Sequence, residues 1–384
     1  MTESEWAGLC DALSVVPDPR SPRGLRYRLA GLLTGAVCAV AAGACSVAAI
    51  ADWLHDLDDI ARARLGFVRG VPAMTTMWRL LIRLDADLLA TVLAGWLRTR
   101  ITPPDRLRRP RYRQVIAVDG KTVRGARRPD GRQVHLLSAL DTSTGIVLAQ
   151  VTVDAKSNEI PAFAPLLDAV EQVLGSLTGL LFVANAMHTQ TAHADEIAAR
   201  GAYLLIPAKG NQPTLHAQLK TLPWAQVPIG HQARNTGHGR RETRTVKALT
   251  LQTPGGITFP HAQQAIRITR TRTRTTTGKT SRETAYLTIS LPAADAHPVD
   301  LQQWIRAEWQ IENKIHHVRD VTFREDSHQA RTSNGPAVMA TLRNTAIGFH
   351  RTNGETNIAR ATRRANRRPH DLITAVTSSN KTTQ

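Results

Sequence analysis

The middle of the chain limits its fold most strongly, because β-rich runs and helical patterns follow one another there in a fixed order. Three runs rich in apolar and β-branched residues come first, at residues 115–119, 134–140 and 146–153. Residues 141–145 read Asp-Thr-Ser-Thr-Gly, which is typical of a turn. We therefore expect three consecutive antiparallel strands, the first of them buried.

Two helix–strand pairs follow these strands. Apolar residues at helical spacing predict a helix from about residue 159, and residues 180–184 predict a buried strand. A second helix is expected over 189–200 and a fifth strand over 203–206. The order β-β-β-α-β-α-β is that of ribonuclease H-like folds. The predicted fold class is therefore α/β, with a ribonuclease H-like core of the retroviral integrase type.

The regions around this core differ from it in pattern. The predicted parts are a small all-α N-terminal domain (1–97), a basic linker (98–113), the core (114–350, with a β-rich insertion at about 213–299) and a basic, partly disordered tail (351–384). Residues 29–51 carry no charge and are long enough to span a membrane. Small residues dominate this stretch, and Gly43 and Ser46 interrupt it, so we expect two buried helices instead.

Positive charge is the feature of composition that bears most on function. The chain has 49 Lys and Arg against 31 Asp and Glu, a formal net charge of +18, and 41 of the 49 are Arg. Because Arg can bind phosphate through two parallel hydrogen bonds, this excess favours a nucleic acid as partner. The three cysteines form no CxxC pair, which argues against a structural zinc site and suits a reducing cytoplasm. The acidic N-terminus does not resemble a signal peptide.

Two acidic residues are candidates for chemistry. Asp119 is predicted to end the first core strand, where a carboxylate is well placed to hold a divalent metal ion. The alternative is that Asp119 and Gly120 begin a turn. A helix expected over about 300–318 would place Glu308, Glu312 and His316 on one face at spacings of four. Glu312 could then ligate a metal, or it could be an exposed residue in a salt bridge.

Several sequence blocks together resemble one known family. The blocks are IAVDGKTVRG, DAKSNEI, VANAMHTQ, IPAKGNQPTL, HGRRETR and IENKIHHVRDVTFRED. They resemble the H-repeat-associated (ISAs-type) DDE transposases of bacterial insertion sequences. The front of the chain, from VVPDPRSPRG to VPAMTTMWRLLIRLD, is similar to the N-terminal domain associated with that family. The resemblance covers roughly residues 10–350.

The resemblance implies a metal-dependent enzyme that cuts DNA at the ends of its element and joins the strands to a target. Asp119 matches the first acid of the DDE site and Glu312 the third. The second acid, in a motif that usually reads Asp-Ala-Met, is replaced by Asn185. The expected cofactor is Mg²⁺, as two ions, with Mn²⁺ as substitute. The expected partners are the terminal repeats, target DNA and a second copy of the chain, in the cytoplasm at the nucleoid.

The resemblance also implies residues around the acids. Glu159 and Asn211 match blocks beside the core strands and are expected to support the site. The expected DNA contacts are Lys121, Arg124, Lys209, Arg240, Arg244, Lys314 and Arg319. Because Asn185 offers an amide oxygen without charge, two functions stay open. The chain is a transposase with impaired catalysis, or an inactive or domesticated transposase that only binds DNA.

Overall fold

The computed structural model describes residues 8–378, apart from 24, 102–112, 128–130, 155–156, 238 and 252–256. Its contacts divide the chain into two compact units, each made of separate stretches. The first unit comprises 1–104, 120–175 and 311–384, and the second comprises 105–119 and 176–310. Most of the predicted linker, and the last six residues of the predicted tail, lie outside the described residues.

Helices form the N-terminal part of the first unit, as predicted. They are α1 (Leu9–Ala12), α2 (Leu29–Ala41), α3 (Val47–His55), α4 (Asp59–Arg64), α5 (Met74–Leu81) and α6 (Ala86–Thr99), with a 3-10 turn η2 (Leu13–Val15) after α1. Gly43, with φ of 104°, separates α2 from α3, and the Ser46 hydroxyl caps α3 by accepting from the Ala49 amide. Among the described residues, no helix is both long and apolar enough to cross a membrane. The uncharged stretch is therefore two helices, as its interruption predicted.

The C-terminal part of the first unit is also helical. Its helices are α12 (His317–Val321), α13 (Gly335–Thr352), α14 (Ile358–Arg367) and α15 (Pro369–Thr377), with a 3-10 turn η6 (Glu325–Ser327) before α13. Helix α13 is buried from Gly335 to His350 and packs on α2, α6 and β3. Within the basic region predicted at 351–384, residues 358–377 form α14 and α15, which bury an apolar side on this unit.

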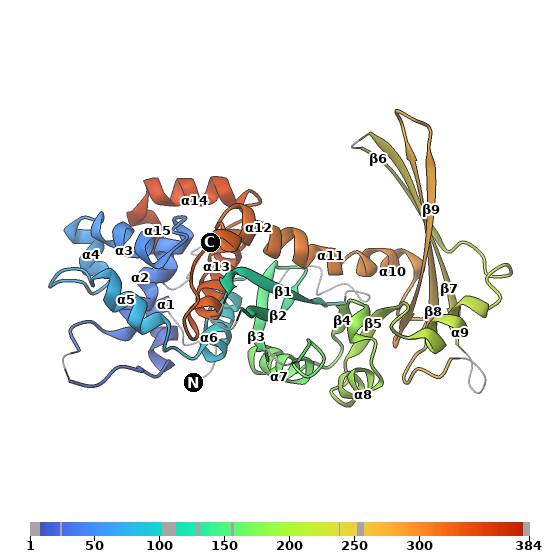
Figure 1. Cartoon of the computed structure of the whole chain (residues 1–384), viewed down its shortest axis with the longest axis horizontal. Helices are drawn as coiled ribbons and strands as arrows, with labels where there is room; N and C mark the ends of the chain where they lie inside the picture. Colours follow the sequence, from blue (N-terminus) through green and yellow to red (C-terminus); the bar gives the residue numbers. More distant parts are fainter. Residues whose placement is uncertain are drawn as a thin grey trace, which may run out of the picture. The chain divides into compact units, whose positions relative to one another are not determined.

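The strands form one sheet in the order β3-β2-β1-β4-β5-β9-β8-β7-β6 (Figure 1). The strands are β1 (Val115–Arg127), β2 (Gln133–Asp141), β3 (Ile146–Val153), β4 (Leu181–Ala184), β5 (Tyr203–Ala208), β6 (His231–Gly237), β7 (Arg240–Thr250), β8 (Gln264–Arg274) and β9 (Thr280–Ile289). Strand β1 is parallel to β4, and β4 is parallel to β5. Strands β2 and β3 are antiparallel. Helices α7 (Phe163–Leu174) and α8 (Thr191–Ala199) precede β4 and β5, as predicted.

Two elements differ from the sequence prediction, and a third adds to it. Strand β1 continues to Arg127, so Asp119 lies within a strand and does not end it or begin a turn. The β-rich insertion, predicted at about 213–299, joins the core sheet, because β9 pairs with β5 from Leu205↔Ile289 onward. Apolar side chains shared by these strands, such as Leu205, Ile266 and Ile289, form one core in the second unit.

The single helix expected over 300–318 is also broken into parts. Helix α10 (Pro298–Ile305) ends before α11 (Glu308–Ile311), and a π-helical turn, η5 (Glu312–His316), joins α11 to α12. A π-helical turn accommodates an extra residue in the helix and often occurs at functional sites. Glu312 and His316 therefore lie at the two ends of the irregular turn.

Candidate active site

Strand pairing brings positions 119 and 185 together in the second unit. The pair Val118↔Ala184 is the last in the parallel register of β1 and β4, so the next residues are Asp119 on β1 and Asn185 just after β4. The Asn185 amide Nδ2 donates to the Asp119 carboxylate Oδ1 over 3.3 Å. Asn185 thus stands beside the first acid, as a neutral hydrogen-bond donor.

The amide oxygen of Asn185 also takes part in a hydrogen bond. Its Oδ1 accepts from the Met187 backbone amide at 2.8 Å and caps the 3-10 turn η4 (Ala186–His188). A carboxylate at position 185 could accept the same bond, but it could not donate to Asp119. Two carboxylates this close would need a cation or a proton between them. The neutral amide of Asn185 can lie beside the Asp119 carboxylate without a cation or a proton between them.

Glu308 is a third polar group with a link to Asp119. Burial raises the pKa of Glu308 above its usual value, and the nearby charge of Asp119 raises it further. Lys209 acts in the opposite direction. The charge of Asp119 therefore acts on the half-buried Glu308, to which the sequence assigned no role.

Glu312 and His316 form a pair on the π-helical turn of the first unit. The Glu312 side chain is 63% exposed, whereas His316 is buried, and His316 Nδ1 lies 3.1 Å from Glu312 Oε2. This hydrogen bond is the main reason that the pKa of Glu312 lies below its usual value, and the charges of His316, Lys121 and His317 act in the same direction. Glu312 is therefore held as a carboxylate with a fixed orientation.

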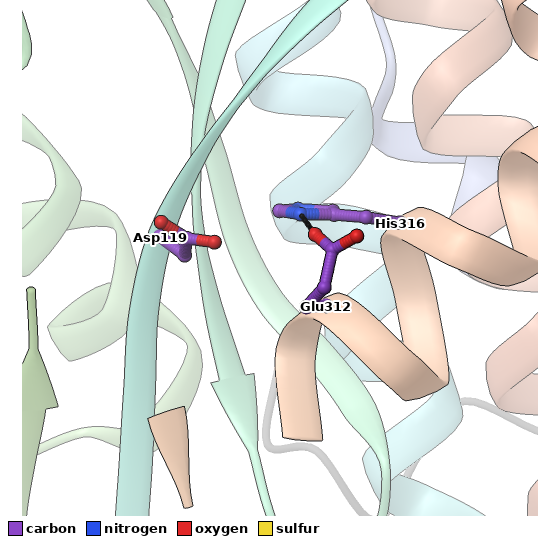
Figure 2. A group of neighbouring side chains, drawn as sticks. All are labelled: Asp119, Glu312 and His316. Atoms are coloured by element: carbon purple, nitrogen blue, oxygen red, sulfur yellow. Dashed lines mark hydrogen bonds and ion pairs between the residues drawn. The ribbon is translucent and has the colours of Figure 1, made fainter. Parts of the chain in front are cut away.

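Asp119, Glu312 and His316 each offer a ligand atom, and these atoms all lie within 4.8 Å of one another (Figure 2). Two carboxylates and an imidazole are a donor set that can hold a divalent metal ion. The sequence singled out the two acids but missed His316 as a possible ligand. Its only signal was the spacing of four residues from Glu312.

Lys121, predicted to contact DNA, is paired with acidic side chains in this structure. It is buried, and its Nζ lies 2.7 Å from Asp320 Oδ2 and 3.9 Å from Asp326 Oδ1. Arg124 lies 3.8 Å from Asp326, but 76% of its side chain is exposed. Of the two cations predicted on β1 to contact DNA, only Arg124 presents its charge to solvent.

Glu159 lies against the backbone of β1, next to Asp119. The Glu159 side chain is buried, and its Oε1 lies 2.9 Å from His135 Nε2. The other ring nitrogen of His135 lies 2.9 Å from the Thr122 hydroxyl. This chain of polar groups packs directly on Gly120, where a Cβ atom would lie 2.1 Å from Glu159 Oε1 and 2.5 Å from His135 Nε2.

We expect Gly120→Ala to destabilise the protein by about 1–3 kcal/mol, because the new methyl group must displace the bonded Glu159–His135 pair. The measurement is the free energy of unfolding from urea denaturation. Gly210→Ala is the matched control, since a Cβ there meets nothing within 4 Å and should leave stability nearly unchanged. Equal stability of the two variants would contradict the close packing at Gly120.

Comparison with known proteins identifies the family. A family model described as the transposase DDE domain matches residues 110–349. A second model, for the region associated with that domain, matches residues 10–97. The chain belongs to the DDE transposase family. The resemblance drawn from the sequence blocks is thereby confirmed.

Relatives of this transposase have similar length. A protein of Escherichia coli O157:H7 named as a transposase, YncI, is 28% identical over 352 residues, which cover 89% of this chain and 87% of YncI. The H repeat-associated protein YhhI of Escherichia coli K12, also named as a transposase, is 25% identical over 364 residues, 90% of each chain. The piggyBac transposase in a synaptic complex with hairpin DNA aligns with a TM-score of 0.42 at 11% identity, covering 96% of this chain and 76% of that one, which is too low to assign a shared fold.

The remaining cations predicted to contact DNA in this transposase lie in different surroundings. Lys209 and Arg240 are exposed. Lys314 is half-buried, its Nζ lies 3.2 Å from the Thr142 carbonyl oxygen, and burial lowers its pKa. Asn211, predicted to support the site, donates to the carbonyl oxygen of Ala186 at 2.6 Å. It therefore fixes the backbone just after Asn185.

Arg319 is completely buried in the first unit of the transposase. Its guanidinium lies 2.7 Å from Glu325 Oε2, and Arg343 lies 2.8 Å from Glu325 Oε1. Arg319 also reaches Gln150 Oε1 at 3.4 Å. Burial and the carboxylate occupy this guanidinium in the structure, and the predicted contact of Arg319 with DNA stays a prediction. The acid that holds it, Glu325, was not singled out from the sequence.

Proposed function

We propose that this transposase cuts and joins DNA at the ends of an insertion sequence, with a divalent metal ion held by Asp119, Glu312 and His316. The grouping of Asp119, Glu312 and His316 ligand atoms within 4.8 Å is the observation that carries this proposal. The order β3-β2-β1-β4-β5, with β1, β4 and β5 parallel, supports a ribonuclease H-like core. The net charge of +18 supports DNA as the substrate.

The donor set fits a divalent ion. Carboxylate oxygens suit Mg²⁺ and Mn²⁺, and three protein ligands would leave positions open for water and phosphate oxygens. When bound, such an ion stabilises the charge that develops on the phosphate during cleavage. Within the chain, His316 fixes the carboxylate of Glu312, and Asn185 fixes that of Asp119. Because one donor is an imidazole, we expect Mn²⁺ to support activity better than Mg²⁺ does.

The reaction has two parts. Cleavage adds water across a phosphodiester bond and leaves a 3′-hydroxyl and a 5′-phosphate. In strand transfer, that hydroxyl attacks a phosphate of the target, the bond from this phosphate to the target's 3′-oxygen breaks, and the target's 3′-hydroxyl leaves. Both parts need negative charge to be neutralised at the phosphate. The role of Asp119 and Glu312 is to concentrate cations where the phosphate binds. Holding two DNA ends at once would require a second copy of the chain, so we propose a dimer on DNA.

A second candidate function is DNA binding without cleavage. Asn185 favours it, because the amide leaves the site one carboxylate short of the three that the DDE family uses. In this case, the protein would occupy element ends and block their use by an active relative. The two candidates differ in whether the unchanged chain cuts DNA at all.

The test is cleavage of labelled DNA that carries the flanking ends of the element, with Mg²⁺ or Mn²⁺. We expect slow cleavage by the unchanged chain that is faster with Mn²⁺, and its loss in Asp119→Asn and in Glu312→Gln. Asp195→Asn is the control, because Asp195 is an exposed acid outside the metal-ligand group. Cleavage that survives both Asp119→Asn and Glu312→Gln would refute the assigned site, and binding without any cleavage would favour the second function.

A further inference from the structure

The four strands β6–β9 lie side by side in one part of the sheet (Figure 1) and pair antiparallel, and the two faces of this part carry different side chains. In antiparallel strands, residues directly opposite each other lie on the same face. One row of opposite residues is Arg234, Thr243, Thr271 and Arg282, and the next row is Thr236, Arg241, Thr273 and Thr280. These two rows contain three guanidiniums, five hydroxyls and no acid. We call them the threonine–arginine face.

The opposite face holds arginines that are already paired. Its rows place Glu242 between Asn235 and Arg272, and the Glu242 side chain is only 8% exposed. Glu242 gathers three guanidiniums: Arg244 at 2.5 Å, Arg270 at 2.8 Å and Arg272 at 3.0 Å. Arg270 also lies over the Trp309 ring, 5.5 Å from its centre. The Arg residues of this cluster therefore stabilise the sheet itself.

The arginines of the threonine–arginine face are not held by an acidic side chain in this way. Arg234, Arg241 and Arg282 are all exposed, and none of them forms an ion pair with another residue that the structure describes. Their hydroxyl neighbours lie on the same surface, where Thr273 and Thr280 are 2.9 Å apart. Unpaired guanidiniums among hydroxyls and without carboxylates make a surface complementary to phosphate.

We infer that the threonine–arginine face binds the phosphate backbone of duplex DNA. This inference rests on the proposed function and adds the surface that holds the DNA. Arg234 and Arg282 are three strand spacings apart, about 14 Å, so they can contact separate phosphates. Threonine hydroxyls can donate to phosphate oxygens between them. Such contacts position the duplex without reading its sequence.

The register also supplies a matched control. Arg274, on the other face, and Lys279, which lies opposite it just before β9, are both exposed. The test therefore compares two double variants: Arg234→Gln with Arg282→Gln, and, as the control, Arg274→Gln with Lys279→Gln. Each removes two exposed charges from the same sheet. Binding to a labelled 30-base-pair duplex is measured by fluorescence anisotropy over a series of salt concentrations, and circular dichroism melting verifies the fold.

For the threonine–arginine double variant, we expect affinity to fall at least about tenfold and the slope of log affinity against log salt to become shallower by about 1.8, as the loss of two phosphate contacts requires. The control should change the slope by less than half as much. Equal effects of the two variants, or a larger effect of the control, would overturn the inference while leaving the proposed function intact. If the unchanged chain bound no DNA, both would fail. The unchanged chain could cleave DNA with metal while the threonine–arginine double variant binds DNA as tightly as the unchanged chain does. That result would refute the inference and leave the proposed function standing.

Discussion

Asn185→Asp is expected to increase strand cleavage by about three orders of magnitude with Mg²⁺. The new carboxylate would lie beside Asp119, since the present amide nitrogen is 3.3 Å from Asp119 Oδ1. A third carboxylate strengthens the binding of a divalent ion and its stabilisation of the phosphate, an effect worth several kcal/mol. If it contributes about 4 kcal/mol to the barrier, the rate rises about a thousandfold. The measurement is the single-turnover rate on DNA carrying the element ends.

The same variant makes a second, independent readout possible. Asp can still accept the hydrogen bond from the Met187 amide, so the local turn should form. Without metal, the adjacent carboxylates repel, so the melting temperature should fall, and Mg²⁺ should restore it. The control is the double variant Asn185→Asp with Asp119→Asn, which exchanges the acid and the amide and should show no gain. Equal rates for the unchanged chain and Asn185→Asp would mean that position 185 is not a ligand.

Glu325→Ala is expected to destabilise the protein by about 3–5 kcal/mol. The Glu325 side chain is completely buried and pairs with Arg319 and Arg343, which are 0% and 1% exposed. Removal of the carboxylate leaves two buried guanidiniums without it, and an uncompensated buried charge is costly. The free energy of unfolding in urea measures the effect. Glu283→Ala is the control, because Glu283 is 62% exposed and its loss should cost less than about 1 kcal/mol.

The pH dependence of stability gives the same cluster a second test. Burial alone would raise the pKa of Glu325, but the charges of Arg319 and Arg343 outweigh it and hold the pKa below its usual value of 4.5. A lowered pKa means that the contribution is complete above pH 4.5 and is lost as the pH falls through the lower value of the folded state. Glu325→Ala should therefore lose less stability, relative to the unchanged chain, at the lowest pH than at pH 7. A difference that grows on acidification would contradict the pairing.

The core strands could be predicted because their local patterns and their neighbours agree. The runs at 134–140 and 146–153 lie within β2 and β3, and the turn between them is the only connection their spacing allows. Gly43 and Ser46 likewise indicated the break between α2 and α3. A glycine that adopts a φ of 104° and a hydroxyl that caps a helix both act on the backbone next to them in the chain. Asp119 and Asn185 are neighbours because parallel strands align the residues that follow them.

The features that the sequence did not predict depend on long-range contacts. Strand β1 extends past Gly120 because it continues to pair in the sheet beside β2, although its second half reads as polar. The pairing of β9 with β5 joins segments about 80 residues apart, which no local pattern encodes. In the sequence, Arg319 looks like a surface cation, but in the structure it is buried against Glu325. His316 became a candidate ligand only through the irregular turn that it ends.

The π-helical turn at Glu312–His316 has a consequence for comparing this chain with its relatives. Each residue of an ordinary α-helix turns it by about 100°, so adding or removing one residue rotates everything beyond it by that angle. A relative with one residue fewer in this turn would carry the same letters after it but direct them elsewhere. Alignments that place a gap inside residues 312–316 would therefore equate side chains that face different neighbours. A relative therefore has the same arrangement at this site only if it keeps the helical phase of the turn as well as its residue types.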